Sequence, residues 1–363
     1  MQTIVRGSLR SLYLYDVSEE IRLDEVRKLV GVPPARREPT FRAPDYVRFE
    51  PPPVIVNLDP VRLDGDEQLQ CRMQYYNYGV VSVEFELAFE FELTRLVELS
   101  GKWIAAPETE KRAAEVVRSR VKLIGPALVN PYDYHLNEDY YVIQVRPLAD
   151  GEGGVCTADQ LIARYGAEIA QIVRGESLRL SQEEQAEVLQ ARLSYYPTDL
   201  LVVGWTAALV YDTAEAAPPT VQLLEYANSQ LLEFRHYDHI LTRLLADVYA
   251  SLSRGTGFLA RWRLANEAER LNTIRLDVRE LTERVDNSIK FLSDMFAARV
   301  YRLAAARIGV PDYRDLVDEK LTTAGELYQF MMDRFHQGRA FILELMVVVI
   351  LIIELVHLFF GKR

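Results

Sequence analysis

Hydrophobic and polar positions alternate with a period of two in several short stretches of the first 215 residues. In residues 79–91, Val and Phe side chains alternate with Ser82, Glu84 and Glu86, a pattern typical of a half-buried strand. Residues 69–76 precede it as the other arm of a predicted hairpin, because Asn, Tyr and Gly separate the two stretches. Further strands are predicted for residues 8–17, 140–145 and 199–211.

Helices are predicted between these strands. They cover residues 23–30, 93–99, 108–124, 158–173 and 182–192. Strands with helices between them, together with a hairpin, indicate an α/β (α+β) domain with a mixed sheet. We therefore expect a head domain over residues 1–215.

The pattern changes to a spacing of three and four residues beyond this domain. Over residues 224–252 this spacing gives four heptads, interrupted once by Asp238. A single polar residue in such a seam commonly fixes the register or the choice of partner. Similar spacings over residues 271–295 and 317–335 predict a helical, coiled-coil-like stalk at residues 218–339. Its seam serves either an intramolecular bundle or association between chains.

The most apolar stretch follows the stalk. Residues 340–360 at about 1.5 Å each give roughly 32 Å of helix, which matches a hydrocarbon core of about 30 Å. We therefore expect one C-terminal transmembrane helix. The N-terminus shows no export signal, so we expect a tail-anchored protein with its head and stalk in the cytoplasm.

Three polar residues form one broad stripe on this expected span, namely Glu344, Glu354 and His357. Such residues usually face a partner helix or a wet cavity, because a charge near the middle of a bilayer is costly. One interpretation is an oligomeric bundle that conducts ions or protons. The other is that Glu344 reaches the nearby interface while Glu354 is protonated or bonded to a neighbouring subunit. Both interpretations predict self-association.

A proline-rich segment at residues 32–53 is predicted to be an extended arm. It contains Arg36, Arg37, Arg42 and Arg48, which either contact ribosomal RNA or anionic lipid headgroups or belong to a solvated linker.

Composition narrows the possible functions. The net charge of −11 argues against a general nucleic-acid binder, and we expect no specific DNA partner. Two cysteines, Cys71 and Cys156, cannot form a disulfide framework or a zinc cluster by themselves, and they fit a reducing compartment.

The sequence contains no recognisable catalytic constellation, so we expect neither an enzyme nor a cofactor. The best metal candidate is the set Glu233, His236 and His239 on one predicted helix, because the two histidines are three residues apart. These residues fall outside the heptad seam, which favours a solvated helix face.

Several segments resemble the required-for-meiotic-nuclear-division family. The similarity lies in Leu343-Glu344 and Glu354-Leu355 with nine residues between the two glutamates, and in Tyr78-Gly79-Val80-Val81. The early LRSLYLYDV and IRLDEVRKLV and the helix from Glu225 to Gln230 are also similar, whereas the usual Phe-Trp after the Tyr-Gly-Val-Val strand is Ser82-Val83. The family's Asp-x-Pro-x-Phe-x-Trp segment is missing.

This resemblance implies a membrane-anchored, non-enzymatic protein that forms large homo-oligomers. It further implies a bacterial inner-membrane protein, or alternatively a protein of the mitochondrial inner membrane, where members support translation. The expected function is a tail-anchored scaffold that self-assembles and presents its head to a cytoplasmic partner, such as the ribosome or another membrane-associated protein. The alternative is an ion or proton channel that uses Glu344 and Glu354.

Overall fold

The computed structural model describes residues 3–32, 52–62, 68–150, 154–253, 269–280 and 295–360. The chain divides into two compact units. The first comprises Met1–His236 with Val285–Tyr313, and the second comprises Tyr237–Arg284 with Arg314–Arg363.

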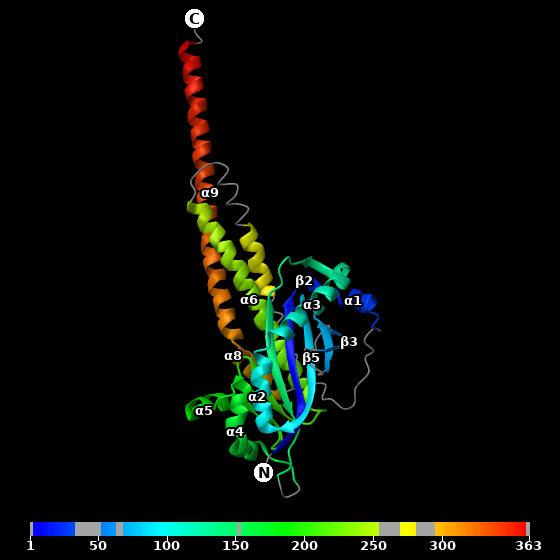
Figure 1. The fold of residues 1–363 in the computed structure, drawn as a ribbon. Helices are drawn as coiled ribbons and strands as arrows, with labels where there is room; N and C mark the ends of the chain where they lie inside the picture. The colour runs from blue at the N-terminus through cyan, green and yellow to red at the C-terminus, as the bar shows by residue number, and fades with distance from the viewer. Residues whose placement is uncertain are drawn as a thin grey trace. The chain divides into compact units, whose positions relative to one another are not determined.

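The first unit is built on an eight-stranded mixed sheet with the strand order β3-β4-β5-β1-β7-β10-β9-β8 (Figure 1). All neighbouring strands are antiparallel except β7 and β10, which run parallel. The strands are β1 (Ile4–Asp16), β3 (Val54–Arg62), β4 (Gln68–Tyr75), β5 (Val80–Glu92), β7 (Asn137–Val145), β8 (Arg192–Leu193), β9 (Leu200–Val203) and β10 (Ala207–Tyr211). The small strands β2 (Ser18–Ile21) and β6 (Leu128–Pro131) form a separate two-stranded sheet. The predicted mixed sheet is therefore confirmed.

One face of this sheet is apolar and carries the hydrophobic core. Leu9 and Tyr13 of β1 and Val83 and Phe85 of β5 belong to it, because alternate side chains of a strand point to the same face. The helices that contribute to this core are α1 (Leu23–Val30), α2 (Leu93–Ile104), α3 (Pro107–Ile124), α4 (Ala158–Arg174) and α5 (Gln182–Gln190), and a short 3-10 helix, η1 (Gly125–Ala127), adds Ala127. The cysteines Cys71 and Cys156 are free thiols buried in this core.

The other face of the sheet is polar, and the first part of α6 (Ala217–Ser253) covers it. Serine, arginine and glutamate side chains of β1 and β5 face this helix, including Ser82 and Glu84, which are 1% and 3% exposed. The sequence pattern of β5 predicts that these residues face solvent, and this is wrong. The strand is buried on both faces because α6 brings its own polar side chains to meet them. Helix α8 (Met295–Ile308) completes the first unit.

The second unit consists of the later part of α6, the helical residues 269–280 and most of α9 (Val310–Phe360). Leu241, Val248, Leu271, Val278 and Val317 are nearly fully buried within it. The heptad seam of α6 is thus occupied by contacts within the chain, as expected for an intramolecular bundle.

The predicted strand over residues 199–211 is two strands. β9 and β10 pair antiparallel, and between them the N–H of Gly204 donates to Ala207 O at 2.8 Å. A Cβ at position 204 would lie 2.5 Å from Val173 Cγ1, so only glycine fits the turn. The apolar run is continuous through this turn because β9 and β10 are buried on both sides, and periodicity therefore does not show the break.

The prediction of a transmembrane helix is wrong, because no helix in the described part of the chain is long and apolar enough to cross a membrane.

Candidate functional site

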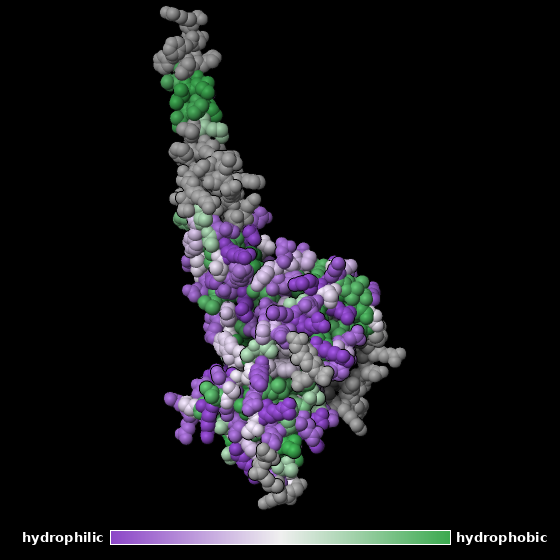
Figure 2. Space-filling model, viewed as in Figure 1, coloured by the Kyte–Doolittle hydropathy of each residue, from purple (hydrophilic) through white to green (hydrophobic). Residues whose placement is uncertain are grey.

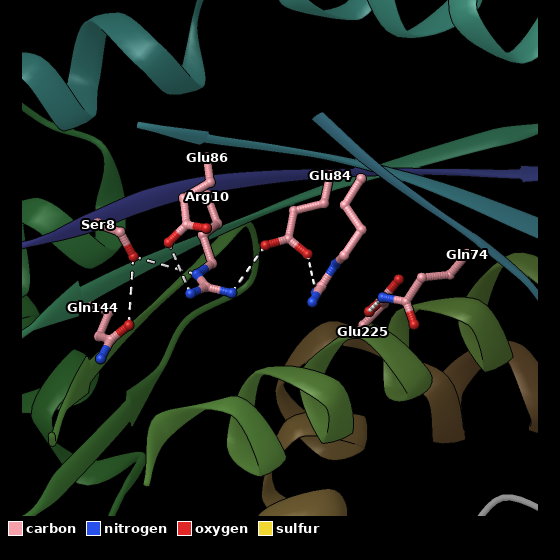
Figure 3. Close-up of polar contacts among 8 residues, drawn as sticks. Ser8, Arg10, Gln74, Glu84, Glu86, Gln144 and Glu225 are labelled. Carbon is pink, nitrogen blue, oxygen red and sulfur yellow. Dashed lines mark hydrogen bonds and ion pairs between the residues drawn. The ribbon is translucent and has the colours of Figure 1, made fainter. Parts of the chain in front are cut away.

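Charged side chains form a buried network between the sheet and α6 (Figure 3). Arg10 of β1 donates from Nη1 to Glu84 Oε1 at 2.9 Å and from Nη2 to Glu86 Oε1 at 2.8 Å. Arg72 of β4 donates to the other oxygen of Glu84. The strand register explains these pairs, since Arg10 lies opposite Glu86 and Arg72 lies opposite Glu84. The buried carboxylate of Glu84 is thereby held between two guanidinium groups.

Glu225 of α6 extends this network from the helix side. Its side chain is fully buried and accepts a hydrogen bond from Gln74 Nε2 at 2.7 Å (Figure 3). Burial and, to a smaller extent, the negative charge of Glu84 raise the pKa of Glu225, whereas Ser82 and Arg72 lower it, and together they bring the pKa to about 7. Glu225 is therefore a buried carboxyl group that exchanges a proton near neutral pH.

The network continues along α6 towards His236. Ser229 and Tyr78 share a hydrogen bond of 2.8 Å, and Nδ1 of His236 lies 2.8 Å from Asp16 Oδ2. The His236 ring also stacks on Tyr132, with 4.4 Å between the ring centroids. Burial raises the pKa of Asp16, which the neighbouring His236 partly counteracts. This arrangement fixes the orientation of α6 on the sheet.

The predicted metal candidate is placed differently from the expectation. Glu233 and His236 are 5% and 7% exposed, so they do not lie on a solvated face. For these two residues the solvated-face interpretation was wrong, because they pack against the polar face of the sheet, whereas His239 is half-buried and belongs to the second unit. Among the described residues, no group of three or more His, Cys, Asp or Glu side chains could hold a metal ion.

A cavity of about 260 Å³ lies beside β9 and β10, where the first turns of α6 meet the sheet. Its walls come from β9, β10, the loop before β9, the first turns of α6, and α8. Two carboxylates line it. Asp199 accepts the N–H groups of Tyr195 and Tyr196 at 2.8 and 2.7 Å, and Asp212 accepts the N–H of Thr213 at 2.7 Å. Burial raises the pKa of Asp212, and the charge of Asp199 raises it as well.

A third feature is an exposed apolar segment of α9, residues 346–355. Its nine large hydrophobic residues are each between 46% and 61% exposed. They form a continuous green stretch in Figure 2. Successive residues of a helix are 100° apart, so the eight consecutive apolar residues 346–353 place side chains on every side of the helix. Monomeric soluble proteins rarely expose an apolar patch that is larger than a few hundred Å².

The remaining predicted site residues lie in or beside the second unit or outside the described residues. Asp238 forms an ion pair with Lys320 of α9, with Asp238 Oδ1 and Lys320 Nζ 2.5 Å apart. Glu354 is exposed within the apolar segment. The side chains of Glu344 and His357, and the arm with Arg36, Arg37, Arg42 and Arg48, lie outside the described residues. The predictions of a channel, of ribosome or lipid contact, and of a non-enzymatic protein therefore stay predictions.

Comparison with known proteins gives a family match for most of the first unit. Residues 6–217 match the family model described as the N-terminal domain of the uncharacterized protein MJ0711. The chain belongs to this family. The MJ0711 protein of Methanocaldococcus jannaschii is 18% identical over 198 residues, which is 54% of this chain and 61% of that relative. The chain thus matches less than two thirds of the length of this curated relative. No solved structure matches the chain with significance.

Membership in the MJ0711 N-terminal domain family corrects the resemblance to the required-for-meiotic-nuclear-division family. That resemblance depended most on Leu343-Glu344 and Glu354-Leu355, which lie outside the matched residues 6–217. Two glutamates in an apolar run satisfy such a short pattern by chance. The match to the MJ0711 N-terminal domain family covers instead the β-strands and helices α1–α5, whose apolar positions build the core.

Proposed function

We propose that this protein is a self-assembling scaffold, in which copies associate through residues 346–355 of α9 and each copy presents its α/β unit to a partner. The observation that supports this proposal is the exposure of nine large apolar side chains on all sides of that helical segment. Burying such side chains contributes roughly 25 cal/mol for each Å² removed from water, so an assembly that covers them is strongly favoured.

The arrangement of the segment favours more than two chains. A single partner helix covers only one side of a helix that is apolar all round. Val349, Ile350 and Ile353 are all β-branched. Val349 lies four residues and Ile350 three residues before Ile353, which are the spacings of a helical seam. β-branched residues at both core positions of a helical seam favour three or four strands over two. We infer an assembly of at least three copies.

The earlier part of the helical unit does not provide this contact. The seam residues Leu241, Leu245 and Val248 of α6 are at most 9% exposed within a single chain, so this seam is already filled. Asp238 likewise has its partner, Lys320, in the same chain. Self-association therefore uses the apolar segment rather than the predicted seam.

Charge substitution in the segment tests the proposal. The double variant Ile350→Glu, Ile353→Glu places two carboxylates where an assembly would bury them, at a cost of several kcal/mol per buried charge. Sedimentation velocity at micromolar concentration should show at least three times the chain mass for the unmodified protein and a monomer for the variant. Leu178→Glu is the matched control, because Leu178 is 79% exposed in the first unit and should not affect the mass.

Two outcomes would contradict the proposal. One is a monomeric unmodified protein at micromolar concentration, and the other is an unchanged mass in the double variant while the control behaves as expected.

A further inference from the structure

The cavity in the first unit combines an apolar floor with an aromatic wall. Leu201, Val210, Leu223 and Val300 line it and are at most 4% exposed, so they form a rigid floor from β9, β10, α6 and α8. A volume of about 260 Å³ is slightly below that of pockets that hold drug-sized ligands, which indicates a smaller ligand.

Aromatic rings form one wall of the cavity. The ring of Tyr195 contacts the ring of Phe296 edge to face, with centroids 5.0 Å apart, and contacts Tyr196 at 4.7 Å. Tyr195 and Tyr196 are 60% and 63% exposed although they line a cavity. Aromatic faces attract cations through the ring quadrupole, and they also pack well on aliphatic chains.

The charged residues that line the cavity indicate the sign of the charge that a ligand would carry. Asp199 and Asp212 both line the cavity, and none of the described residues that line it is Lys, Arg or His. Asp199 is held in place by two backbone N–H groups of the 195–196 turn, whereas one oxygen of Asp212 accepts the N–H of Thr213. The charge of Asp199 raises the pKa of Asp212, so the two carboxylates are close enough to repel each other. A cation between them would relieve this repulsion.

We propose that this cavity binds a small alkylammonium ion. The ammonium group donates hydrogen bonds to Asp212 and interacts with the charge of Asp199. The alkyl chain lies on the apolar floor beside Tyr195 and Phe296, which also face the cation. The inference is independent of self-assembly, since every residue that lines the cavity belongs to the first unit.

Three probes of similar size test whether the ligand must carry a charge and whether this charge must be positive. Isothermal titration calorimetry of the full chain with n-butylammonium chloride should give saturable binding with a dissociation constant in the millimolar range or below. 1-Butanol and sodium butyrate should bind at least about tenfold more weakly, because they lack the positive charge that a half-buried carboxylate recognises.

Two variants identify the site. Asp212→Asn keeps the size of the side chain and its acceptor for the N–H of Thr213, and it should weaken n-butylammonium binding at least about tenfold. Tyr195→Leu should also weaken binding, about three- to tenfold, through loss of the aromatic face. Glu215→Gln is the matched control, because Glu215 is an exposed carboxylate outside the cavity lining and should leave binding unchanged.

The proposal is overturned if 1-butanol binds as tightly as n-butylammonium, or if Asp212→Asn binds the ion as well as the unmodified chain does. It is also overturned if n-butylammonium gives no saturable binding up to tens of millimolar. The comparison of the three probes on the unmodified chain remains decisive even if a variant fails to fold.

Discussion

At the scale of single residues, the buried polar side chains between the sheet and α6 distinguish this fold from an ordinary α/β sandwich. Glu84 and Glu225 are almost completely removed from water, and their charges are compensated by Arg10, Arg72 and the amide of Gln74. Removing one partner from such a group costs more than the net value of the pair, because it leaves a buried charge uncompensated. The sequence shows these residues only as the polar half of an alternating strand or helix. Nothing in that pattern distinguishes a solvated face from one that another polar face covers.

Glu225 makes the stability of the protein depend on pH in a direction that can be tested. Burial raises its pKa from 4.5 to about 7, so the folded state binds the proton more tightly than the unfolded chain does. The contribution to the free energy of unfolding is therefore complete below about pH 4.5 and is lost as the pH rises to about 7. The loss amounts to about 3 kcal/mol at most. In Glu225→Gln this part of the pH dependence should be absent.

Denaturant unfolding between pH 4.5 and 8 measures the free energy of unfolding of the unmodified chain and of Glu225→Gln. The difference between these two free energies at each pH isolates the contribution of Glu225 from those of other titrating groups. Glu215→Gln, at an exposed position, should keep the profile of the unmodified chain. A profile of Glu225→Gln that runs parallel to that of the unmodified protein would contradict this account.

At the scale of the elements, the sequence predicts those parts whose hydrophobic period is undisturbed. The helix at Leu23–Val30 and the hairpin of β4 and β5 are found where the pattern places them. β3 was missed because it is an edge strand in which only Val54 and Val61 are buried, and its register shifts between Leu58 and Val61, where Pro60 lies. The candidate cavity could not be predicted at all. Its walls come from residues 193–223 and 296–300, which the fold alone brings together.

The turn between β4 and β5 provides a prediction about an element. Gly79 has a φ of +95°, and a Cβ there would lie 1.7 Å from the carbonyl oxygen of Ser18. Gly79→Ala should therefore destabilise the protein by about 3 kcal/mol or more, because the left-handed conformation is unfavourable and the backbone of β2 must move. Gly31→Ala is the control, because Gly31 has a φ of +71° but nothing within 4 Å of the added atom. It should cost only about 1 kcal/mol. Equal losses in urea unfolding of the two variants would show that the close approach to Ser18 is unimportant.

At the scale of the whole molecule, the two units differ in how much apolar surface they leave exposed. The α/β unit, which belongs to the MJ0711 N-terminal domain family, buries its own core and leaves a small acidic cavity. The helical unit fills its own seam but exposes the apolar residues 346–355. The length of the apolar stretch in the sequence predicted a long helix there that must be covered, but the expected cover was a membrane. The described side chains support an assembly of several copies as the proposed cover.

Cysteine cross-linking tests this central claim most directly, because it reports contact between copies at a chosen residue. The natural thiols Cys71 and Cys156 are 3% and 0% exposed, so a cysteine introduced into the segment is the accessible one. Single variants such as Val349→Cys, made in turn at residues 347–353, should form disulfide-linked dimers on mild oxidation, with yields that peak at a spacing of three or four residues. Leu178→Cys, at a position that is more exposed than any in the segment but lies outside it, should remain monomeric on a denaturing gel. Yields across residues 347–353 that are no higher than that of Leu178→Cys would contradict the account.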